Sequence, residues 1–570
     1  MTTPDGPRIS LRLVAIAVAV LALAAIGCLA FIAMSTAQAA REVQASIARV
    51  SESARSFDLS AIEIDLASTR AAAADLNVHT SGFGWQLIEM LPVTGTTARA
   101  ITQSGATTAD LAAAALPLAA TLQGDSSTMA RLMGALGAQD ELRALSTASR
   151  KAAESFAPYQ SSQLLFGISE AIDQSVTALP ALADALDAAA SAAEPLQRML
   201  GKDSPTTWLV MAQNPAEIRG SGGLFNAYLL VRFTNGQPEI IEAGSRKQLD
   251  GEFPRAEQIP YKDAIDAATA NTWGPALGEW ASFNLPGDFA TVGQLAAAGM
   301  AKRGTPVDGV IAIDPTIVAA VLAGTGPVEH KGVMIDSTTA VDFFTKGLYE
   351  SYPGFDDVAA KDDLAMGLTY ATVDSALTRP LDLAGLWGSM GEAISEGHLK
   401  VWSADPGIEQ WLTTTTASGT LASRPDEIVI RLNNATGGKL DAYAATRFST
   451  DFSRCASEGY VMATITIENQ APAGLPEYVD VTLDQDGVPD PNAPKGQTTN
   501  YVTAYPPAGW DLAVAYLNGS IVKPSDGREN GRRAWTIPVT VPRNAEGVLS
   551  LTLAADACPT GSAPTTASNR

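Results

Sequence analysis

Histidine and cysteine are scarce in this sequence of 570 residues, which contains three of each. The histidines, His79, His330 and His398, are far apart, and no two of them have the spacing of metal ligands on one helix or turn. A zinc site would have to be assembled from remote segments. With only three histidines, a Ser-His-Asp hydrolase triad is not expected, and no Cys-His arrangement is evident.

Basic residues are also few. The chain has 38 Lys and Arg against 61 Asp and Glu, which gives a net charge of -23 at pH 7. Such a charge repels phosphodiester backbones and anionic lipid surfaces at long range, so we expect no nucleic-acid partner. Hydrophobic residues make up 46% of the chain, which at this length predicts several packed domains rather than a disordered protein.

One long apolar run lies near the N-terminus. The segment "LVAIAVAVLALAAIGCLAFIAM", residues 13–34, has no charged residue, and as a helix it is long enough to cross a bilayer core of about 30 Å. Arg8 and Arg12 precede it and Arg41 and Arg49 follow it, so the basic bias is weak. We expect a single-pass protein of the cell membrane that contacts the bilayer through this helix. Residues 1–12 then form a cytoplasmic tail, and the rest is extracytoplasmic.

The cysteines bear on that topology. Cys28 lies inside the apolar run, so Cys455 and Cys558 are the only cysteines of the expected extracytoplasmic part. In an oxidising compartment these two could pair as a disulfide. They could equally be two unpaired thiols, and the sequence alone leaves both alternatives open.

Ala-rich helical patterns follow the membrane segment, and they predict an α-helical stalk or bundle over residues 35–204. Apolar residues spaced four and three apart indicate helix-on-helix packing: Val43, Ile47, Val50, Ala54, Phe57, Ala61 and Ile64. The segment "HTSGFGWQLIEMLPVTG" interrupts the pattern with glycines and a proline. Further helices are expected over 96–123, 127–157 and 162–199.

Strand patterns alternate with helix patterns over residues 205–420, which predicts a three-layer α/β core. Asn235-Gly236 suits a hairpin turn, and the buried strand "VDGVIAID" leads to Asp314 as an N-cap and Pro315 in the first turn of a helix. Short strands with Pro, Gly and Asn between them predict a β-sandwich over 421–560. We expect residues 561–570 to be a disordered tail.

Four motifs occur in the order of a known family: "NPAEIRGSGGLFNAYLL", "FNLPGDF", "VDGVIAIDPTIVAAVLAGTGPV" and "NNATGGKLDAYAA". With these motifs the chain resembles the bacterial membrane-anchored family known as domain of unknown function 4012. The resemblance covers most of the chain after the membrane helix, including "WQLIEMLPVTG". It implies an envelope protein and declares no activity.

The α/β part is also similar to the LytR-CpsA-Psr enzymes, through "VDGVIAIDPTIVAAVLAGTGPV" and the order of arginine, turn and strand at Arg219. That resemblance implies a glycopolymer phosphotransferase that acts on a polyprenyl-pyrophosphate carrier. Such enzymes bind the pyrophosphate through arginines and a divalent ion through acidic residues. The acidic residue that follows their arginine is absent here, because Ser221-Gly222-Gly223 stand in its place.

Candidate anion ligands lie at and after this turn. The guanidinium of Arg219 can pair with two phosphate oxygens, and the turn at Gly222 and Gly223 can offer backbone N–H groups. The same residues suit a plain turn in which Arg219 pairs with Glu217 or with a backbone carbonyl. Arg246 and Lys247 follow the second strand of the predicted hairpin, where a substrate loop would emerge, although they also suit a solvated surface.

Candidate metal ligands are Asp250, Asn284 and Asp288. Their oxygen atoms suit a hydrated Mg²⁺, which needs only one or two carboxylates from the protein. In the alternative interpretation Asn284 and Asp288 form a turn and an N-cap before the next helix.

Two functions follow from these patterns. In the first, the α/β core of an envelope protein binds or transfers lipid-pyrophosphate-linked glycopolymer in cell-wall or capsule biogenesis. In the second, the protein is a non-catalytic envelope scaffold or adhesion module. A basic pocket that contains Arg219, Arg246 and Lys247 would favour the first, and the missing acidic residue favours the second.

Overall fold

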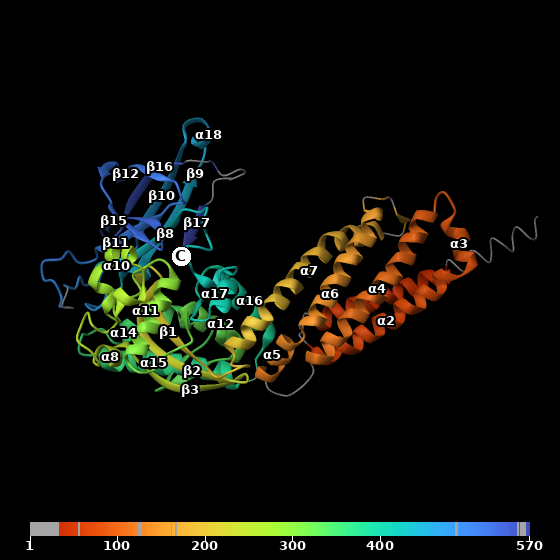
Figure 1. Ribbon diagram of the computed structural model, residues 1–570, viewed down its shortest axis with the longest axis horizontal. Coiled ribbons are helices and arrows are strands. Elements are labelled where there is room, and N and C mark those ends of the chain that lie inside the picture. Colours follow the sequence, from red (N-terminus) through yellow and green to blue (C-terminus); the bar gives the residue numbers. More distant parts are fainter. Residues whose placement is uncertain are drawn as a thin grey trace, which may run out of the picture. The chain divides into compact units, whose positions relative to one another are not determined.

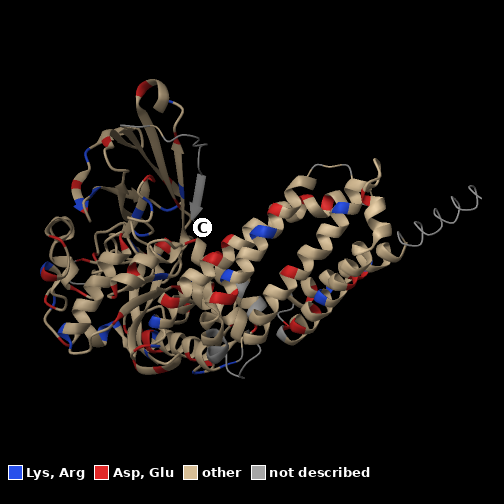
Figure 2. Cartoon of the chain, turned by 45° about the vertical axis from the view of Figure 1, so that its right-hand side comes forward, with Lys and Arg blue, Asp and Glu red and all other residues tan. Residues whose placement is uncertain are grey.

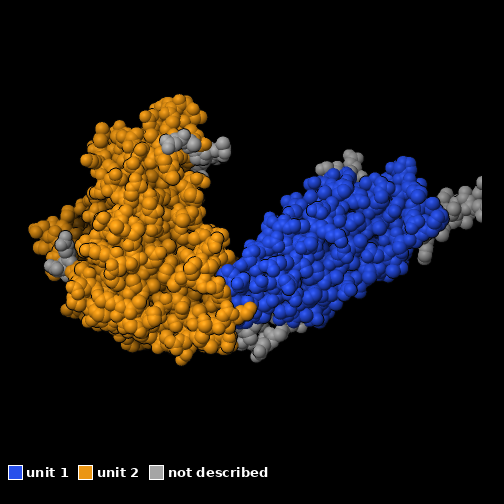
Figure 3. Space-filling model, viewed as in Figure 1, with its two compact units in different colours: residues 1–197 blue, residues 198–570 orange. Residues whose placement is uncertain are grey.

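The computed structural model describes residues 34–54, 58–122, 128–160, 162, 164–165, 168–379, 381–484, 488–555, 558 and 566–569. The chain is a mixed α/β protein with many helices and several sheets, as the sequence predicts (Figure 1). It forms two compact units, residues 1–197 and 198–570 (Figure 3). Residues 1–33, which include nearly all of the predicted membrane helix, lie outside the described residues.

Unit 1 is helical. Residues 34–54 form its first described helix, and the others are α2 (Leu59–Ser81), α3 (Phe83–Glu89), α4 (Gly95–Leu122), α5 (Thr128–Gly137), α6 (Gln139–Phe156) and α7 (Ile168–Met199). The first helix and α2 form an antiparallel pair, in which Ala39 and Val43 share a core with Ala73 and Leu76. Asp58 begins α2 as an N-cap that accepts a hydrogen bond from the Ala61 amide.

Two helix predictions are wrong in detail. The apolar seam from Val43 to Ile64 is not continuous, because α2 runs back along the helix of residues 34–54. Ile47 and Ile64 are consequently 44% and 69% exposed. The helix expected over 127–157 is divided into α5 and α6 at Gly137 and Ala138. Glycine is a poor helix former, so a break at this point costs little.

Among the described residues, α7 is the one helix that is long and apolar enough to cross a membrane. Length and composition alone are weak evidence for a membrane anchor, because core helices of soluble proteins share them. Here α7 packs against α6: Ser146 donates to the Ala183 carbonyl, and Arg150 forms ion pairs of 2.8 and 2.7 Å with Asp184 and Asp187.

Unit 2 contains a five-stranded sheet in the order β3-β2-β1-β4-β7. Its strands are β1 (Thr206–Arg219), β2 (Gly222–Thr234), β3 (Gln237–Ser245), β4 (Gly309–Ile313) and β7 (Lys400–Ser403). Only β1 and β4 pair in parallel among these strands. The predicted Asn-Gly turn joins β2 to β3, with positive φ angles of 48° at Asn235 and 77° at Gly236.

Helices cover both faces of this sheet. Leu209 and Met211 of β1 pack with Val292 and Leu295 of α11 (Phe289–Lys302) on one face. Val210, which points the other way, packs with α12 (Pro315–Thr325). The remaining helices of this part are α8 (Arg246–Asp250), α9 (Tyr261–Ala264), α10 (Ala267–Trp273), η3 (Gly274–Gly278), α13 (Ala340–Asp342), η4 (Phe343–Gly347), α14 (Leu348–Ser351), α15 (Val358–Thr378), α16 (Leu383–Ser395), α17 (Pro406–Leu412) and η5 (Thr416–Ser418). A small hairpin joins β5 (Val328–His330) to β6 (Val333–Ile335).

The rest of unit 2 holds two antiparallel sheets, in the orders β13-β12-β16-β10-β9-β17 and β14-β15-β11-β8. Ile465 of β10 and Leu551 of β16 share a core with Val502 of β11 and Ile537 of β15, so the sheets pack face to face. The elements are β8 (Val429–Asn434), η6 (Leu440–Tyr443), β9 (Ala444–Asp451), α18 (Cys455–Glu458), β10 (Tyr460–Asn469), β11 (Thr498–Tyr505), β12 (Asp511–Leu517), β13 (Ser520–Val522), β14 (Ser525–Glu529), β15 (Arg532–Val541), β16 (Ala545–Ala554) and β17 (Thr566–Asn569).

One strand prediction for this region is wrong. The segment "YVDVTLD" forms no ladder strand, and within it only Leu483 makes an isolated bridge, to Pro489. Within the segment expected as a tail, β17 pairs with β9. Without β17, β9 would be an edge strand with unpaired N–H and C=O groups, which another strand can satisfy.

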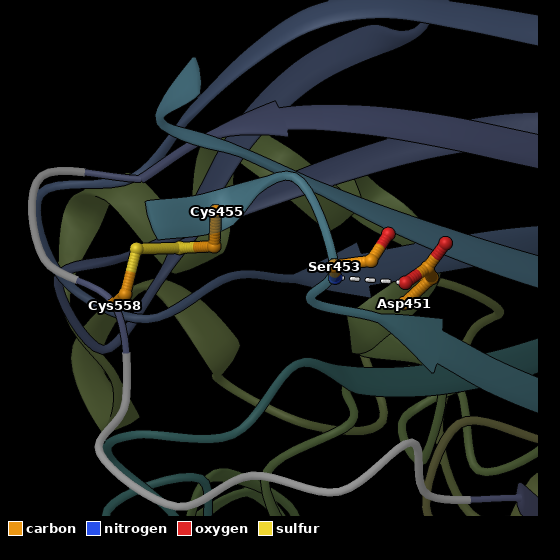
Figure 4. Close-up of a disulfide and its surroundings, with 4 residues drawn as sticks. All are labelled: Asp451, Ser453, Cys455 and Cys558. Atoms are coloured by element: carbon orange, nitrogen blue, oxygen red, sulfur yellow. Dashed lines mark hydrogen bonds between the residues drawn. A yellow bond between two sulfur atoms is a disulfide. The ribbon is translucent and has the colours of Figure 1, made fainter. Parts of the chain in front are cut away.

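A disulfide joins the start of α18 to the chain after β16 (Figure 4). The Cα atoms of Cys455 and Cys558 are 5.8 Å apart, and Cys455 is buried in the core of the two sheets. The structure thus selects one of the two alternatives that the sequence leaves open.

We predict that replacing Cys455 and Cys558 together by Ser lowers the free energy of unfolding by about 4 to 5 kcal/mol, because the bridge closes a loop of about 100 residues in the unfolded chain. Denaturant unfolding of the wild type and the variant measures the difference. Reductant should bring the wild type to the level of the variant and leave the variant unchanged. Three titrating thiols in the unfolded, unreduced protein, instead of Cys28 alone, would contradict the bridge.

Candidate functional site

Strand β1 continues past its pairing with β4 and ends against the C-terminal sheets. Parallel pairing with β4 ends at Ala212, whereas β1 runs on to Arg219. In this extension the Ile218 amide donates to Asp441 at 3.0 Å, and directly after the strand the Gly220 amide donates to Asn433 at 2.7 Å. The extension therefore joins the α/β sheet to the β-rich part within unit 2.

A buried ion-pair triad lies at this joint. Glu217 binds Arg219 at 2.5 Å through one carboxylate oxygen and Lys439 through the other, and all three side chains are less than 10% exposed. Burial by itself raises the pKa of Glu217, but the charges of Lys439 and Arg219 outweigh it and hold the pKa below its usual value. Glu217 is therefore a carboxylate that needs both cations.

The turn after Arg219 is closely packed. Gly222 has φ of 141°, and a Cβ there would lie 2.2 Å from the Gln213 side chain. A Cβ on Gly223 would lie 2.2 Å from the Asn214 backbone. Ser221 donates to the Asn284 carbonyl, while Arg219 and Gly222 pair in the β1–β2 ladder. These glycines serve close approach of the two strands.

A second buried carboxylate, Glu529 at the end of β14, joins the same two parts. It accepts hydrogen bonds from the Asp288 amide at 2.7 Å, from Trp273 Nε1 at 3.1 Å and from the Tyr505 hydroxyl at 2.6 Å. Burial raises the pKa of Glu529 to about 7. Its donors come from both the α/β part and β11, so this carboxylate also holds the joint together.

A pocket opens beside the joint, at the carboxyl ends of the parallel strands β1 and β4, where α/β sheets bind ligands. Its cavity volume is about 70 Å³, which is enough for several water molecules. We call it the junction pocket. Its lining residues are Ala212, Gln213, Asn214, Leu224, Asn226, Ala227, Arg246, Lys247, Ile313, Asp314, Pro315, Val318, Phe344, Leu348, Tyr349, Lys361, Asp362, Ala365, Thr369, Lys439 and Tyr478.

Four cationic side chains converge on the junction pocket: Arg246, Lys247, Lys361 and Lys439. All four have a carboxylate partner, and the pair of Lys361 with Asp362 is the longest of them. Arg246 binds Asp250, Lys439 binds Glu217, and the Lys247 ammonium is 3.4 Å from Asp362.

Lys361 differs from the other three. Its side chain is 6% exposed, and it shares its carboxylate partner Asp362 with Lys247, at the longer distance of 3.8 Å. The ammonium lies 3.7 Å from the ring centroid of Tyr478, a cation–π contact. Within the described residues we find no hydrogen bond from this ammonium. Burial lowers the pKa of Lys361 to about 8, because leaving water disfavours the charged form.

Polar and aromatic groups fix the inner wall. Tyr349 and Tyr478 stack with ring centroids 6.0 Å apart, and the Tyr349 hydroxyl accepts a hydrogen bond of 3.0 Å from Asn214. Nε2 of Gln213, which also lines the pocket, is buried and has no hydrogen-bond partner among the described residues. Asp314 caps α12 through the Thr316 amide, as the sequence predicts, and so one of its oxygens is committed.

Part of the lining is apolar. Val318, Phe344 and Leu348 belong to a core cluster between α12, α15 and the β5–β6 hairpin, and each of them also lines the pocket. Ile313 of β4 and Ala365 of α15 extend this apolar wall. The junction pocket is therefore lined by both cationic and apolar side chains.

The structure places the predicted site residues in two locations. Arg246 and Lys247 line the junction pocket, whereas Arg219, Gly222 and Gly223 are in the joint and do not line it. Arg219 therefore does not form one basic pocket with Arg246 and Lys247, the arrangement that would favour the glycopolymer function. Arg219 takes the structural role that the sequence left open, as the partner of Glu217.

The predicted metal ligands are not brought together. Asp250 is the partner of Arg246. Asn284 donates to the Gly223 carbonyl, and Asp288 caps α11 and accepts a second hydrogen bond from Asn530. Among the described residues no three His, Cys, Asp or Glu side chains are arranged to hold a metal ion. We therefore assign no role to Mg²⁺ at this site.

Sequence reasoning missed Lys361, Lys439 and Tyr478. For Lys361 a signal existed, because it falls on the buried stripe of α15 with Leu364 and Leu368, where a lysine is unusual. Lys439 and Tyr478 follow from no local pattern, since only the packing of the β-rich part against β1 brings them to the pocket.

Comparison with known proteins adds one finding. Residues 203–349 match the model of a family described as "Protein of unknown function (DUF4012)". This match confirms the predicted resemblance to that family. The match runs from just before β1 to Tyr349, so Lys361, Lys439 and Tyr478 lie outside it. No curated protein and no solved structure matches the chain. The similarity to LytR-CpsA-Psr enzymes stays a prediction.

We predict that Arg219→Ala lowers the free energy of unfolding by about 2 kcal/mol or more, because it leaves Glu217 buried with one cation instead of two. Thermal and denaturant unfolding measure the loss. Arg447→Ala is the matched control, since it removes an exposed Arg–Glu pair at 3.1 Å and should cost less than about 1 kcal/mol. If Arg219→Ala were as stable as the wild type but no longer bound pyrophosphate, the turn would be an anion site after all, which would contradict the structural role.

Proposed function

We propose that this chain is a membrane-anchored, extracytoplasmic envelope protein whose junction pocket binds the pyrophosphate head of a polyprenyl-linked glycan. The observation that carries the proposal is the convergence of Arg246, Lys247, Lys361 and Lys439 on one pocket. Acidic residues outnumber basic ones across the chain, and Figure 2 shows charges of both signs over both units. An anion that reaches this pocket gives the Lys361 ammonium the charge-assisted hydrogen bond that it lacks.

The apolar wall supports a ligand with a lipid part. Val318, Phe344 and Leu348 line the same pocket as the lysines, so an oxyanion attached to a hydrocarbon chain can contact both kinds of side chain. Burying each CH₂ group of such a chain contributes about 0.8 kcal/mol. A polyprenyl pyrophosphate has this combination of charge and hydrocarbon, whereas a free sugar or an inorganic anion has only one part of it.

Export and anchoring rest on two separate observations. The uncharged run at residues 13–34 is long enough to cross a bilayer. The Cys455–Cys558 disulfide suits an oxidising compartment, because cytosolic thiols are kept reduced. Together they support a single-pass protein of the cell membrane with both units outside the cytoplasm.

Binding is the activity that the side chains of the pocket support. Transfer of the glycan, as in the LytR-CpsA-Psr enzymes, calls for acidic ligands of a divalent ion next to the cations. In the pocket Asp362 is placed between Lys247 and Lys361, and Asp314 caps α12 and binds His398 at 2.6 Å. Both carboxylates are therefore engaged by the protein itself, and we propose no transfer step.

A scaffold role is the second candidate, and one observation favours it. The turn that would replace the transferase's acidic residue, Ser221-Gly222-Gly223, is used in packing β1 on β2 and on the Asn284 loop. In that account the two C-terminal sheets bind an envelope partner and the junction pocket has no ligand.

Titration with farnesyl pyrophosphate, a short isoprenoid pyrophosphate, separates the two candidates. We predict that the wild-type chain binds it in EDTA, and binds it more tightly than inorganic pyrophosphate because of the apolar wall. Lys361→Met should lower the affinity for farnesyl pyrophosphate by at least about tenfold, since it removes a charge-assisted hydrogen bond that contributes about 1.5 to 3 kcal/mol. Isothermal calorimetry measures both affinities.

Lys523→Met is the matched control, because Lys523 is exposed between β13 and β14 and its loss changes the net charge equally. Its affinity should equal that of the wild type. Thermal melts should show that Lys361→Met remains folded, since the native lysine is a buried charge whose removal relieves desolvation. If the wild type did not bind, or if all three proteins bound equally, the pyrophosphate-binding proposal would be refuted and the scaffold role would be favoured.

The pH dependence gives an independent prediction. In the folded chain without ligand the Lys361 pKa is about 8, and an anion binds the protonated form better. Affinity for farnesyl pyrophosphate should therefore be nearly constant from pH 6.5 to about 7.5 and should fall by up to about tenfold per pH unit above about 8. The decline should be absent in Lys361→Met. The same decline in both proteins would show that another group titrates.

A further inference from the structure

Unit 1 carries an exposed apolar surface at one end. We call it the α3 patch, and its residues are Phe83, Leu87, Met90, Leu91 and Val93. Their exposed fractions are 75%, 42%, 80%, 47% and 79%. Figure 1 shows α3 at the end of the unit where α2 stops and α4 begins.

The spacing of the patch is helical. Phe83, Leu87 and Met90 are separated by four and three residues and so share one face of α3 and the turn that follows it. The opposite face is also apolar, and there Trp85 and Ile88 pack with Ala98 of α4. The inward face accounts for the folding of α3, whereas the outward face contributes nothing to this core.

Charge is almost absent from the same surface. Between His79 and Arg99 the only charged residue is Glu89. Its carboxylate accepts a hydrogen bond of 2.7 Å from Thr102 on α4, so the carboxylate is engaged within the unit. The five side chains of the patch are therefore apolar, and the exposed guanidinium of Arg99 lies beside them, where it donates to the Glu89 carbonyl at 2.7 Å.

The first helix fixes the level of the patch. Ser53 binds Asp65, and one turn earlier Arg49 binds Ser68 at 3.1 Å, which shows two helices in antiparallel register. The contact between Arg49 and Ser68 serves as a reference point. Met34 precedes Arg49 by the same number of residues by which Phe83 follows Ser68. Because both helices rise by about 1.5 Å per residue, the end of the apolar run at 13–34 and the start of the α3 patch are level with each other.

We propose that the α3 patch inserts into the surface of the lipid bilayer that the segment 13–34 crosses. The inference rests on the membrane anchor of the proposed function and adds a second membrane contact to it. The segment ends at Met34, so the bilayer boundary lies at that residue and the patch meets it. An apolar helical face of this kind lies in the boundary between headgroups and acyl chains.

Photo-crosslinking of the full chain in phosphatidylcholine vesicles tests the contact. The photoreactive residue p-benzoylphenylalanine replaces Leu87 or Met90, both of which are exposed, so folding should be unaffected. The matched control has the same residue at Ile64, which is 69% exposed on α2 and lies about 25 Å along the helix from Ser81. We expect lipid adducts at positions 87 and 90 at about tenfold or more the yield at position 64, measured by mass spectrometry.

Three other results would overturn the inference. Equal adduct yields at all three positions, in a chain that resists alkaline extraction from the vesicles, would refute the second contact and leave the anchor standing. Adducts between chains instead of lipid adducts would assign the patch to a second copy of the protein. Release of the chain by alkaline extraction would refute the anchor itself, independently of pyrophosphate binding by the junction pocket.

Discussion

The burial of Glu217 between Arg219 and Lys439 is the interaction on which unit 2 depends. A carboxylate removed from water without its cations would cost several kcal/mol, so the two cations must stay with it. Arg219 comes from the same strand, but Lys439 comes from the β-rich part more than two hundred residues later. The ion pair between Glu217 and Lys439 therefore holds the C-terminal sheets against the extension of β1. Glu529, at the end of β14, strengthens the same joint.

The junction pocket is a consequence of that joint. Lys439 and Tyr478 reach the carboxyl ends of β1 and β4 only because the β-rich part is fixed there. Tyr478 in turn provides the ring over which the Lys361 ammonium lies. Arg246, Lys247 and Lys439 each have a closer carboxylate partner than Lys361, which shares Asp362 with Lys247 at 3.8 Å and makes no hydrogen bond among the described residues, so an incoming anion would give its ammonium one. A phosphate-bearing lipid satisfies this charge and the apolar wall together.

Local sequence patterns predicted local structure well. The Asn235-Gly236 turn, the Asp314 cap and the alternation of strands and helices each depend on residues that are close in the chain. Arg246 and Lys247 could be placed near a site because they follow a strand. Arg219 could not be assigned, since whether it meets a ligand or Glu217 depends on where Lys439 comes to lie. The cations of the pocket likewise come from segments that only tertiary packing unites, and a single sequence carries no signal for that packing.

A crystal structure of the chain with farnesyl pyrophosphate bound would test the central claim most directly. The account predicts density for the pyrophosphate in the junction pocket, within hydrogen-bonding distance of the Lys361 ammonium, with the isoprenoid chain along Phe344 and Leu348 and with Arg219 still bound to Glu217. Density at the turn formed by Gly222 and Gly223, with Arg219 released from Glu217, would contradict it.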